Sequence, residues 1–390
     1  MAGEEKPYRV YRGGRKKGKV PTVGNSRVRS ASEAGRRDTP SAEYRGPGAP
    51  VSRRRPRWGL RIGLGIAALV LLLVIWGVVG WLSLASGVSD ANKRLDPNAK
   101  SELAPQSGLL ISHSTTILML GTDNAQIVGR TGDDHSDSIM LLRTDPSHHR
   151  LYYLSIPRDL QVPIPGYGTE KINAAFQLGG VTLAIKTIHE FTSLPINHVI
   201  VVNFGAFKDL IDAIGGIDVN VPKPIHSNRF DCPFSAARCQ TWQGYRFAKG
   251  EQHMNGARAL VYSRIRENLL DPSETDVTRG ARQQAVIDSV TSKLASVSTF
   301  FKLPFSGSSY VKPLTTDLST AQLVELGWVK FRASSSSSVH CRLGGDLGGG
   351  GNGSPSEDNP AALAMFLGKS APQPPTDAFA PGCITGHPLQ

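Results

Sequence analysis

The sequence predicts an α/β protein in which a mixed central β-sheet is flanked by helices and preceded by one transmembrane helix. Three observations carry this prediction. Apolar strands and amphipathic helices alternate over residues 114–330, as in α/β domains. A long uncharged segment, Ile62–Leu84, precedes them. The net charge of +12 lies in the first 61 residues, ahead of both.

The basic charge belongs to an N-terminal tail. Residues 1–57 hold sixteen Lys and Arg against five acidic residues, a net charge of +11, and Arg61 supplies the remaining unit. Few large apolar residues occur there, so we expect a disordered cytoplasmic tail. Its arginine-rich end either binds the anionic inner leaflet or only sets the topology. The charge lies on a tail and no base-reading element is visible, so the sequence argues against a nucleic-acid partner.

The segment Ile62–Leu84 has 23 residues without a charge. A helix of this length covers about 34 Å, enough to cross the hydrocarbon core of a bilayer. Because the arginines of residues 53–61 flank one side only, the positive-inside rule places the N-terminus in the cytoplasm and the rest of the chain outside. A cleaved signal peptide fits less well, because the preceding tail is too long for its basic region. We therefore predict a single-pass anchor over residues 58–84 in the cell membrane, and a polar juxtamembrane linker over residues 85–113.

All four cysteines follow this segment, in what we predict to be an oxidising compartment. They allow three pairings, of which we favour Cys232 with Cys239 and Cys341 with Cys383. A zinc site is the alternative, but the spacing of cysteine and histidine gives it no support.

The globular part begins near residue 114. Apolar runs predict strands at residues 115–120, 138–143, 151–156, 198–202 and 217–221. Apolar residues at helical spacing predict helices at residues 180–194, 204–214 and 277–297. These elements form the predicted globular α/β domain, residues 114–330. The Ser-, Gly- and Pro-rich residues 331–390 are expected to be a mobile low-complexity segment that a disulfide tethers.

Charged residues gather where the predicted strands end, which is where α/β sheets build their sites. Carboxylates follow the first strand and precede the second, a Pro-Arg-Asp sequence follows the third, and a lysine comes soon after. Two arginine pairs lie further along the chain. The residues concerned are Asp123, Asp137, Arg158, Asp159, Lys171, Arg264, Arg266, Arg279, Arg282 and Gln283.

Guanidinium groups suit phosphate oxygens, and Mg²⁺ shared between carboxylates and a substrate phosphate is the usual arrangement for phosphoryl transfer. The plainer interpretation is a surface network of salt bridges with Glu267, Glu274 and Asp276. Serine-hydrolase, zinc-protease and Walker motifs do not occur in the sequence.

Several segments together resemble the LytR–CpsA–Psr family of cell-wall glycopolymer ligases. The matching segments are Ile117–Asp123, Ser136–Leu141, Leu154–Asp159, Lys171–Ala175, Pro195–His198, Ile214–Val219, Tyr262–Arg266 and Asp276–Gln284. Their order and spacing make the match specific, and a single anchor before an external domain suits the family. The resemblance departs in two places: the family's first motif often reads Gly-Ser-Asp-x-Arg, whereas Asp123 is followed here by Asn124 and Ala125, and His135 stands where an arginine is often found.

The resemblance implies an enzyme that takes a glycan from a polyprenyl-pyrophosphate carrier and transfers glycan-1-phosphate to a peptidoglycan hydroxyl. It also implies an apolar tunnel for the lipid and Mg²⁺ bound by Asp123 and Asp137. The implied pyrophosphate-binding residues are Arg158, Lys171, Arg264, Arg266, Arg279, Arg282 and Gln283. Arg158, Asp159, Arg266 and Arg279 are the implied catalytic residues, with either Asp159 or a metal-activated hydroxyl handling the proton.

Two other functions remain open from the sequence. The same site in a polyprenyl-pyrophosphate hydrolase would use water as acceptor. A non-enzymatic receptor that binds wall glycans would signal through its basic tail.

Overall fold

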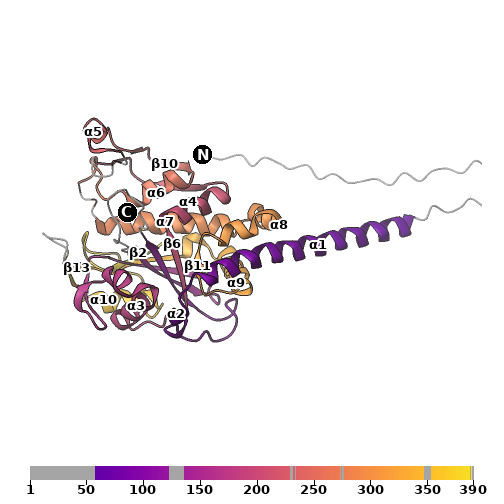
Figure 1. Ribbon diagram of the computed structural model, residues 1–390, viewed down its shortest axis with the longest axis horizontal. Helices are drawn as coiled ribbons and strands as arrows, with labels where there is room; N and C mark the ends of the chain where they lie inside the picture. Colours follow the sequence, from indigo (N-terminus) through magenta and orange to yellow (C-terminus); the bar gives the residue numbers. More distant parts are fainter. Residues whose placement is uncertain are drawn as a thin grey trace, which may run out of the picture. The chain divides into compact units, whose positions relative to one another are not determined.

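The computed structural model describes residues 58–122, 136–228, 232, 234–272, 274, 276–346, 353–386 and 388. A seven-stranded mixed sheet organises the unit Gly59–Gln390, with strand order β11-β6-β1-β2-β3-β12-β15 (Figure 1). Its strands are β1 (Thr116–Thr122), β2 (Ser136–Asp145), β3 (Arg150–Ile156), β6 (His198–Asn203), β11 (Thr315–Thr316), β12 (Val339–Arg342) and β15 (Gly382–Thr385). The predicted mixed α/β fold is confirmed.

The strand directions bring several strand ends to one edge of the sheet. β1 pairs in parallel with β6 and antiparallel with β2, while β3 pairs antiparallel with β2 and in parallel with β12. The carboxyl ends of β1, β3, β6 and β12 therefore lie at the same edge, together with the start of β2. This edge is where the predicted site residues leave the sheet.

Helices cover both faces of the sheet (Figure 1). In β1, Ile117 belongs to one apolar core and Leu118 to the other, because side chains of a strand alternate between its faces. Helices α4 (Phe204–Ala213), α6 (Gly256–Arg264), α7 (Asp276–Leu294), α8 (Val297–Val311) and α9 (Thr320–Arg332) contribute to the core that contains Ile117. Helices α2 (Pro97–Ser101), α3 (Ala174–Thr192) and α10 (Asn359–Phe366) contribute to the other.

Short elements complete the described chain. Four two-stranded ladders join β4 (Gln161–Ile164) to β5 (Gly168–Lys171), β7 (Ile217–Val221) to β10 (Gly250–Met254), β8 (Ile225–His226) to β9 (Arg246–Phe247), and β13 (Gly345–Asp346) to β14 (Ser354–Pro355). The chain also forms α5 (Ala236–Cys239) and a 3₁₀ turn, Ser335–Ser337. The ladder of β4 with β5 carries Lys171 back toward the end of β3.

The apolar N-terminal helix, α1, runs from Trp58 to Lys93, nine residues beyond the predicted anchor. Leu84, Val88 and Ala91 recur at helical spacing and are buried in the domain core. The prediction that residues 85–113 form a polar linker is therefore wrong. The helix that is long and apolar enough to cross a membrane also begins the folded domain.

The prediction of a mobile tether over residues 331–390 is also wrong for the residues that the structure describes. β12 lies inside the central sheet, between β3 and β15, and the four residues of β12 are buried. Cys341 and Cys383 sit opposite each other in β12 and β15 and form a disulfide, and Cys232–Cys239 forms the other, which is the favoured pairing. The strands in this part of the chain are short and are separated by Ser- and Gly-rich stretches, so the sequence pattern did not predict them.

The predicted helix over residues 277–297 corresponds to α7, and α8 follows it as a separate helix. α7 ends at Leu294, and the side chain of Ser296 accepts a hydrogen bond from the backbone of Thr299 to cap α8. α3 begins six residues before the predicted start, with a break at Gly179 and Gly180, where Gly180 has φ 62°. Both differences come from local capping and glycine geometry, which apolar periodicity does not show.

Candidate active site

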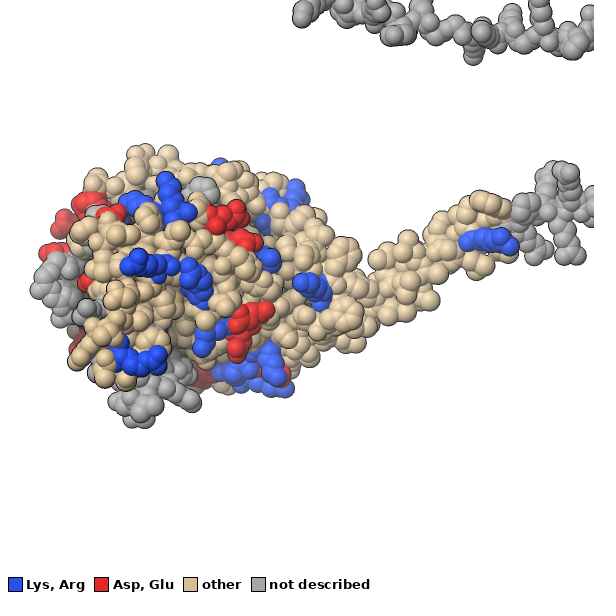
Figure 2. All heavy atoms as spheres, turned by 90° about the horizontal axis from the view of Figure 1, so that it is seen from above, with Lys and Arg blue, Asp and Glu red and all other residues tan. Residues whose placement is uncertain are grey.

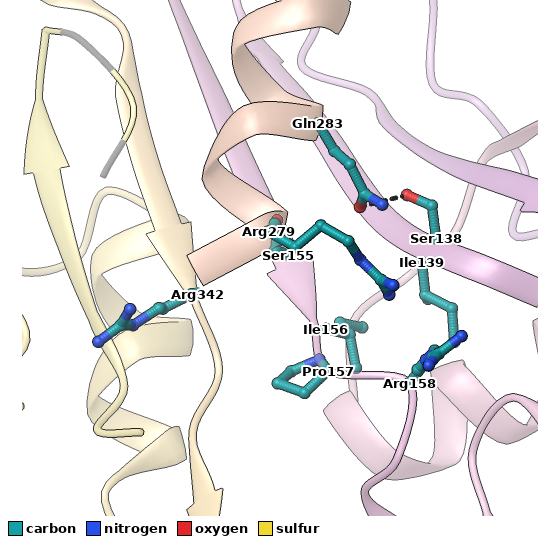
Figure 3. A pocket seen from close by; sticks show the side chains of 10 residues that line it. Ser138, Ile139, Ser155, Ile156, Pro157, Arg158, Arg279, Gln283 and Arg342 are labelled. Atoms are coloured by element: carbon teal, nitrogen blue, oxygen red, sulfur yellow. Dashed lines mark hydrogen bonds between the residues drawn. The ribbon is translucent and has the colours of Figure 1, made fainter. Parts of the chain in front are cut away.

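A polar pocket lies at the sheet edge where β3 and β12 end and β2 begins. It is lined by residues of these strands, of the turn after β3 and of the first turns of α7, shown in Figure 3: Ser138, Ile139, Ser155, Ile156, Pro157, Arg158, Arg279, Gly280, Gln283 and Arg342. Among these described residues three are arginines and none is acidic. The pocket therefore suits an anion.

Helix α7 reaches the strands closely because Gly280 faces β3. A Cβ atom at this position would lie 3.1 Å from the hydroxyl oxygen of Ser155 and 3.2 Å from its Cβ, closer than ordinary contact. Arg279 and Gln283 are one turn apart on α7, so both side chains point into the space above the strand ends (Figure 3). The glycine thus fixes the distance between the helix and the pocket floor.

Arg279 and Gln283, two of the candidate site residues, both line the pocket. Arg279 is buried, with 6 % of its surface exposed. The side-chain oxygen of Gln283 accepts a hydrogen bond of 2.8 Å from the hydroxyl of Ser138 on β2. This bond joins α7 to β2 across the pocket (Figure 3).

Arg158, Asp159 and Lys171 form a connected group at the end of β3. Asp159 lies 3.4 Å from Nε of Arg158 and accepts a hydrogen bond of 3.0 Å from Nζ of Lys171. The backbone N–H of Asn173 donates to the carbonyl of Arg158, which ties the turn after β3 to the start of α3. Arg158 points toward the same space as Arg279 (Figure 3). Lys171 is not a lining residue and acts here through Asp159.

Arg342 is a pocket residue that the sequence analysis did not find. Its Nε donates to the carbonyl of Ala380 at 3.0 Å, and its Nη2 donates to the carbonyl of Asp377. Burial lowers the pKa of Arg342, and the charge of Asp377 partly offsets this. In Figure 3 the guanidinium points away from Arg158 and Arg279, so its contacts fasten β12 to the C-terminal segment. Arg342 follows Cys341 in a stretch that we expected to be mobile, so the sequence did not indicate that this residue lines a pocket.

Gln284 is a second residue that the sequence did not single out. Its side-chain nitrogen donates to the hydroxyl of Ser155 and to the carbonyl of Cys341, each at 2.8 Å, and its oxygen lies 3.0 Å from Nδ1 of His340. The whole amide is buried. It joins α7 to both β3 and β12, directly behind Gln283.

Changing Gln284 to leucine is expected to destabilise the fold, because it removes the hydrogen bonds that the Gln284 side chain forms with Ser155, Cys341 and His340. Each such loss costs about 1–3 kcal/mol. Urea denaturation measures this loss of unfolding free energy, which should appear as a lower midpoint with an unchanged m-value. The matched control is Gln177→Leu, on α3. Equal stability of the Gln284 variant and the wild type would contradict this role.

Arg282 does not enter the pocket, contrary to its predicted part in binding pyrophosphate. It is almost fully buried, with its Nη1 donating to the carboxylate of Glu274 and its Nη2 to the carbonyl of Ile265. Because Ile265 precedes Arg266, this contact fixes the loop that carries Arg266 against α7. The expected salt bridge with Glu274 is present, but it is largely buried and is not part of a surface network.

Replacing Arg282 with methionine is expected to destabilise the protein by about 3–5 kcal/mol, because the largely buried carboxylate of Glu274 loses its arginine partner and keeps the amide of Asn268. Thermal denaturation measures this loss. The double change Arg282→Met with Glu274→Gln should recover much of it. A single variant that is as stable as wild type but defective in substrate binding would instead place Arg282 in the site.

The first arginine pair lies apart from the pocket lining. The guanidinium of Arg264 stacks over the ring of Phe204, 4.3 Å from its centre, and the side chain is exposed. Arg266 is half-buried on the loop after α6. The structure thus brings Arg158, Arg279 and Gln283 together and leaves Arg264, at the end of α6, and Arg266, on the loop after it, outside the pocket lining.

The predicted metal ligands are described only in part. Asp123 lies outside the described residues, as do Asn124, Ala125 and His135, and of Asp137 only the backbone position on β2 is described. Thr122, the residue before Asp123, pairs with Ser136 at the same sheet edge as the pocket. Within the described ranges no group of three or more His, Cys, Asp or Glu side chains is arranged so that it could hold a metal ion.

This architecture defines a class: an α/β domain with an arginine-lined polar pocket at its sheet edge, joined to one helix long enough to span a membrane. Residues 78–341 match the LytR_cpsA_psr family, and the chain belongs to this family.

Among relatives, the chain is 33 % identical over 272 residues to a protein of Bacillus mycoides strain KBAB4. That protein is named polyisoprenyl-teichoic acid–peptidoglycan teichoic acid transferase TagU, and the match covers 66 % of this chain and 82 % of the relative.

Two solved structures share the fold. A structure of TagT bound to LIIa-WTA matches with a TM-score of 0.51 and 26 % identity, over 67 % of this chain and 94 % of that one. The crystal structure of B. subtilis TagV matches with a TM-score of 0.51 and 27 % identity, over 66 % of this chain and 98 % of that one.

Proposed function

We propose that this protein is a membrane-anchored phosphotransferase that moves a glycopolymer from a polyprenyl-pyrophosphate carrier to a hydroxyl of peptidoglycan. The observation that carries the proposal is the pocket at the sheet edge, where Arg158 and Arg279 meet with no acidic lining residue among those described. A relative that is 33 % identical bears the name of such a transferase, which supports the assignment.

In the proposed reaction an acceptor hydroxyl attacks the phosphorus next to the glycan. A new P–O bond forms to the acceptor, the bond to the second phosphate breaks, and polyprenyl phosphate leaves with the bridging oxygen. The hydroxyl proton passes to a base or to solvent. Arg158 and Arg279 would hold the pyrophosphate and stabilise the charge that builds on the oxygens, which is the main contribution a protein makes to phosphoryl transfer.

The remaining pocket residues would position these two arginines. Asp159 holds Arg158 and Lys171 through its carboxylate, and Gln283 fixes α7 to Ser138 of β2. Arg266, on the loop that Arg282 holds against α7, would be a further arginine that binds the pyrophosphate. The predicted apolar tunnel for the lipid stays a prediction.

Mg²⁺ is part of this proposal, with Asp123 and Asp137 as its ligands. Carboxylate oxygens are the ligands that Mg²⁺ prefers, and the backbone of Asp137 is next to Ser138, which lines the pocket. Bound there, the ion would neutralise charge on the transferred phosphate.

The change Asp137→Asn is expected to raise the Mg²⁺ concentration needed for half-maximal transfer at least tenfold. A carboxylate that binds a divalent cation contributes both charge and coordination, and the amide supplies only coordination. Mn²⁺ binding followed by electron paramagnetic resonance gives an independent reading. Unchanged metal titrations in both assays would remove Asp137 from the metal site.

Asp159 is expected to position Arg158 rather than to take the acceptor's proton, because both of its carboxylate oxygens already face cations. The variant Asp159→Asn should raise KM for the lipid-linked donor and leave the pH dependence of kcat unchanged. If the variant lost the rise of kcat with pH that deprotonation of a base produces, Asp159 would instead be identified as the general base.

Release of polyprenyl phosphate, measured with and without peptidoglycan oligomers, tests the proposed reaction against hydrolysis. A transferase requires the acceptor, so release should rise steeply when oligomers are added. Release at the same rate without acceptor would identify a hydrolase, and tight donor binding without any release would identify a binding protein.

The anchor belongs to the same proposal. α1 would cross the cell membrane with the N-terminus in the cytoplasm and the pocket outside, because the arginines of residues 53–61 lie on the N-terminal side of its uncharged segment. Both disulfides suit that oxidising side.

A further inference from the structure

The helix α8 carries large apolar side chains that the domain does not cover. Val297, Phe300, Phe301 and Phe305 are exposed by 58 %, 51 %, 59 % and 87 %. They lie between the start of the helix and the residue just past its middle, after the short turn that follows α7. Exposed apolar clusters of this kind mark surfaces that interact with a membrane or with another protein.

α8 packs lengthwise along α1, and the two helices run in the same direction. Trp76 lies 4.6 Å from the ring of Phe300, and its indole nitrogen donates to the carbonyl of Phe301 at 3.3 Å. Further along, Gly80 contacts Leu303 and Pro304.

Small residues let the two helices approach even more closely toward the domain. Gly87 meets the backbone of Ser308, and Gly307 meets that of Leu84. The backbone N–H of Ser308 also donates to the hydroxyl of Ser83 at 3.2 Å. The position of α8 beside α1 is thus fixed at both ends.

This packing sets the depth of α8 relative to the uncharged segment of α1. Trp76 is eight residues before Leu84, the end of that segment, which is about 12 Å along a helix. A hydrocarbon core of about 30 Å that begins at Ile62 ends near Trp81, so Trp76 would be about 7 Å inside it. Phe300 and Phe301, which contact Trp76, would lie at the same depth.

Charge agrees with this placement. From the domain outward, the exposed stem of α1 shows no Lys, Arg, Asp or Glu side chain until a basic one near its far end (Figure 2). Between Leu294 and Val311 the one charged residue is Lys302, whose long side chain can reach lipid phosphates from within the interface.

We infer that the N-terminal half of α8 inserts into the outer leaflet of the membrane beside α1 and makes a second membrane contact. The inference rests on the proposed crossing of the membrane by α1. The lipid bilayer is what covers the exposed apolar surface of α8, because this surface continues the apolar surface of α1 at the same depth. Two contacts would fix the orientation of the domain, and hence of the pocket, against the membrane that carries the lipid-linked donor.

The test uses the full chain in nanodiscs of phosphatidylglycerol and phosphatidylcholine, with an environment-sensitive NBD label on single added cysteines. The variants are Val297→Cys, Phe301→Cys and Phe305→Cys. Leu71→Cys reports on α1 itself, and Tyr167→Cys on the exposed β4–β5 turn serves as the aqueous control. Quenching by doxyl lipids measures depth, and transfer activity checks that each variant folds.

We expect blue-shifted emission and strong quenching at positions 71, 297 and 301, weaker quenching at 305 and none at 167. Quenching should fall from 297 to 305, since these positions are about 12 Å apart along the helix. Quenching at 71 with water-like emission at 297 and 301 would overturn the inference and leave the anchor intact. Shielding at 301 without lipid quenching would indicate contact with a second copy and also overturn it. No quenching at 71 would overturn the anchor, and with it the inference.

Discussion

Changing Arg158 to alanine is expected to lower the rate of glycopolymer transfer about 10²–10³-fold, a loss of roughly 2.7–4 kcal/mol of transition-state stabilisation. The side chain lies at the pocket with 13 % of its surface exposed, and its partner Asp159 remains held by Lys171. The fold should therefore survive. Initial rates with a short-chain donor measure the effect, together with a melting curve.

Two further variants make this result specific. Arg279→Ala should cause a loss of similar size, since Arg279 reaches the pocket from α7. Arg264→Ala is the matched control, because its guanidinium stacks on Phe204 and does not line the pocket. If Arg264→Ala abolished transfer while Arg158→Ala kept most of it, the catalytic centre would lie at the end of α6 and not at the pocket.

Removal of the Cys341–Cys383 disulfide by paired alanine changes is expected to destabilise the protein by about 4 kcal/mol, from the chain entropy of a loop of this length. The bond joins β12 to the edge strand β15, and β12 forms part of the pocket wall. Transfer should consequently fall as temperature rises, well before it does in the wild type. Denaturant titration and activity against temperature measure both effects.

The second disulfide provides the comparison. Cys232–Cys239 closes a shorter loop, for which the same relation gives about 2.5 kcal/mol, and it lies beside α5, away from the pocket lining. Its removal should leave transfer unchanged at low temperature. Equal effects of the two removals on transfer would show that the C-terminal strands do not support the pocket.

Sequence patterns predicted the elements whose apolar periodicity is regular. β1, β3, β6 and α4 lie within about two residues of their predicted ranges. The three strands are buried on both faces and therefore appear as continuous apolar runs, and α4 shows apolar residues at helical spacing. The disulfide pairing was also predicted, from loop length. The family followed from the order and spacing of motifs, and the family match confirms it.

The missed features depend on contacts between distant parts of the chain. β12 reads as a short run beside low-complexity sequence, and only its pairing with β3, nearly 190 residues earlier, makes it a core strand. Arg282 reads as one of an arginine pair, but Glu274 and Ile265 turn it inward. Gln284 looks like its neighbour Gln283 in sequence, and the helix phase alone sends one into the core and the other into the pocket.

The most direct test of the proposed function follows the acceptor itself. We would incubate the full chain in nanodiscs with a polyprenyl-pyrophosphate glycan, Mg²⁺ and peptidoglycan oligomers, and record the mass of the oligomers. The whole chain is needed because Leu84, Val88 and Ala91 of α1 are part of the domain core. We predict a gain equal to one glycan-phosphate, with loss of the signal in Arg158→Ala. Release of polyprenyl phosphate with no gain of mass on any oligomer would contradict the proposal.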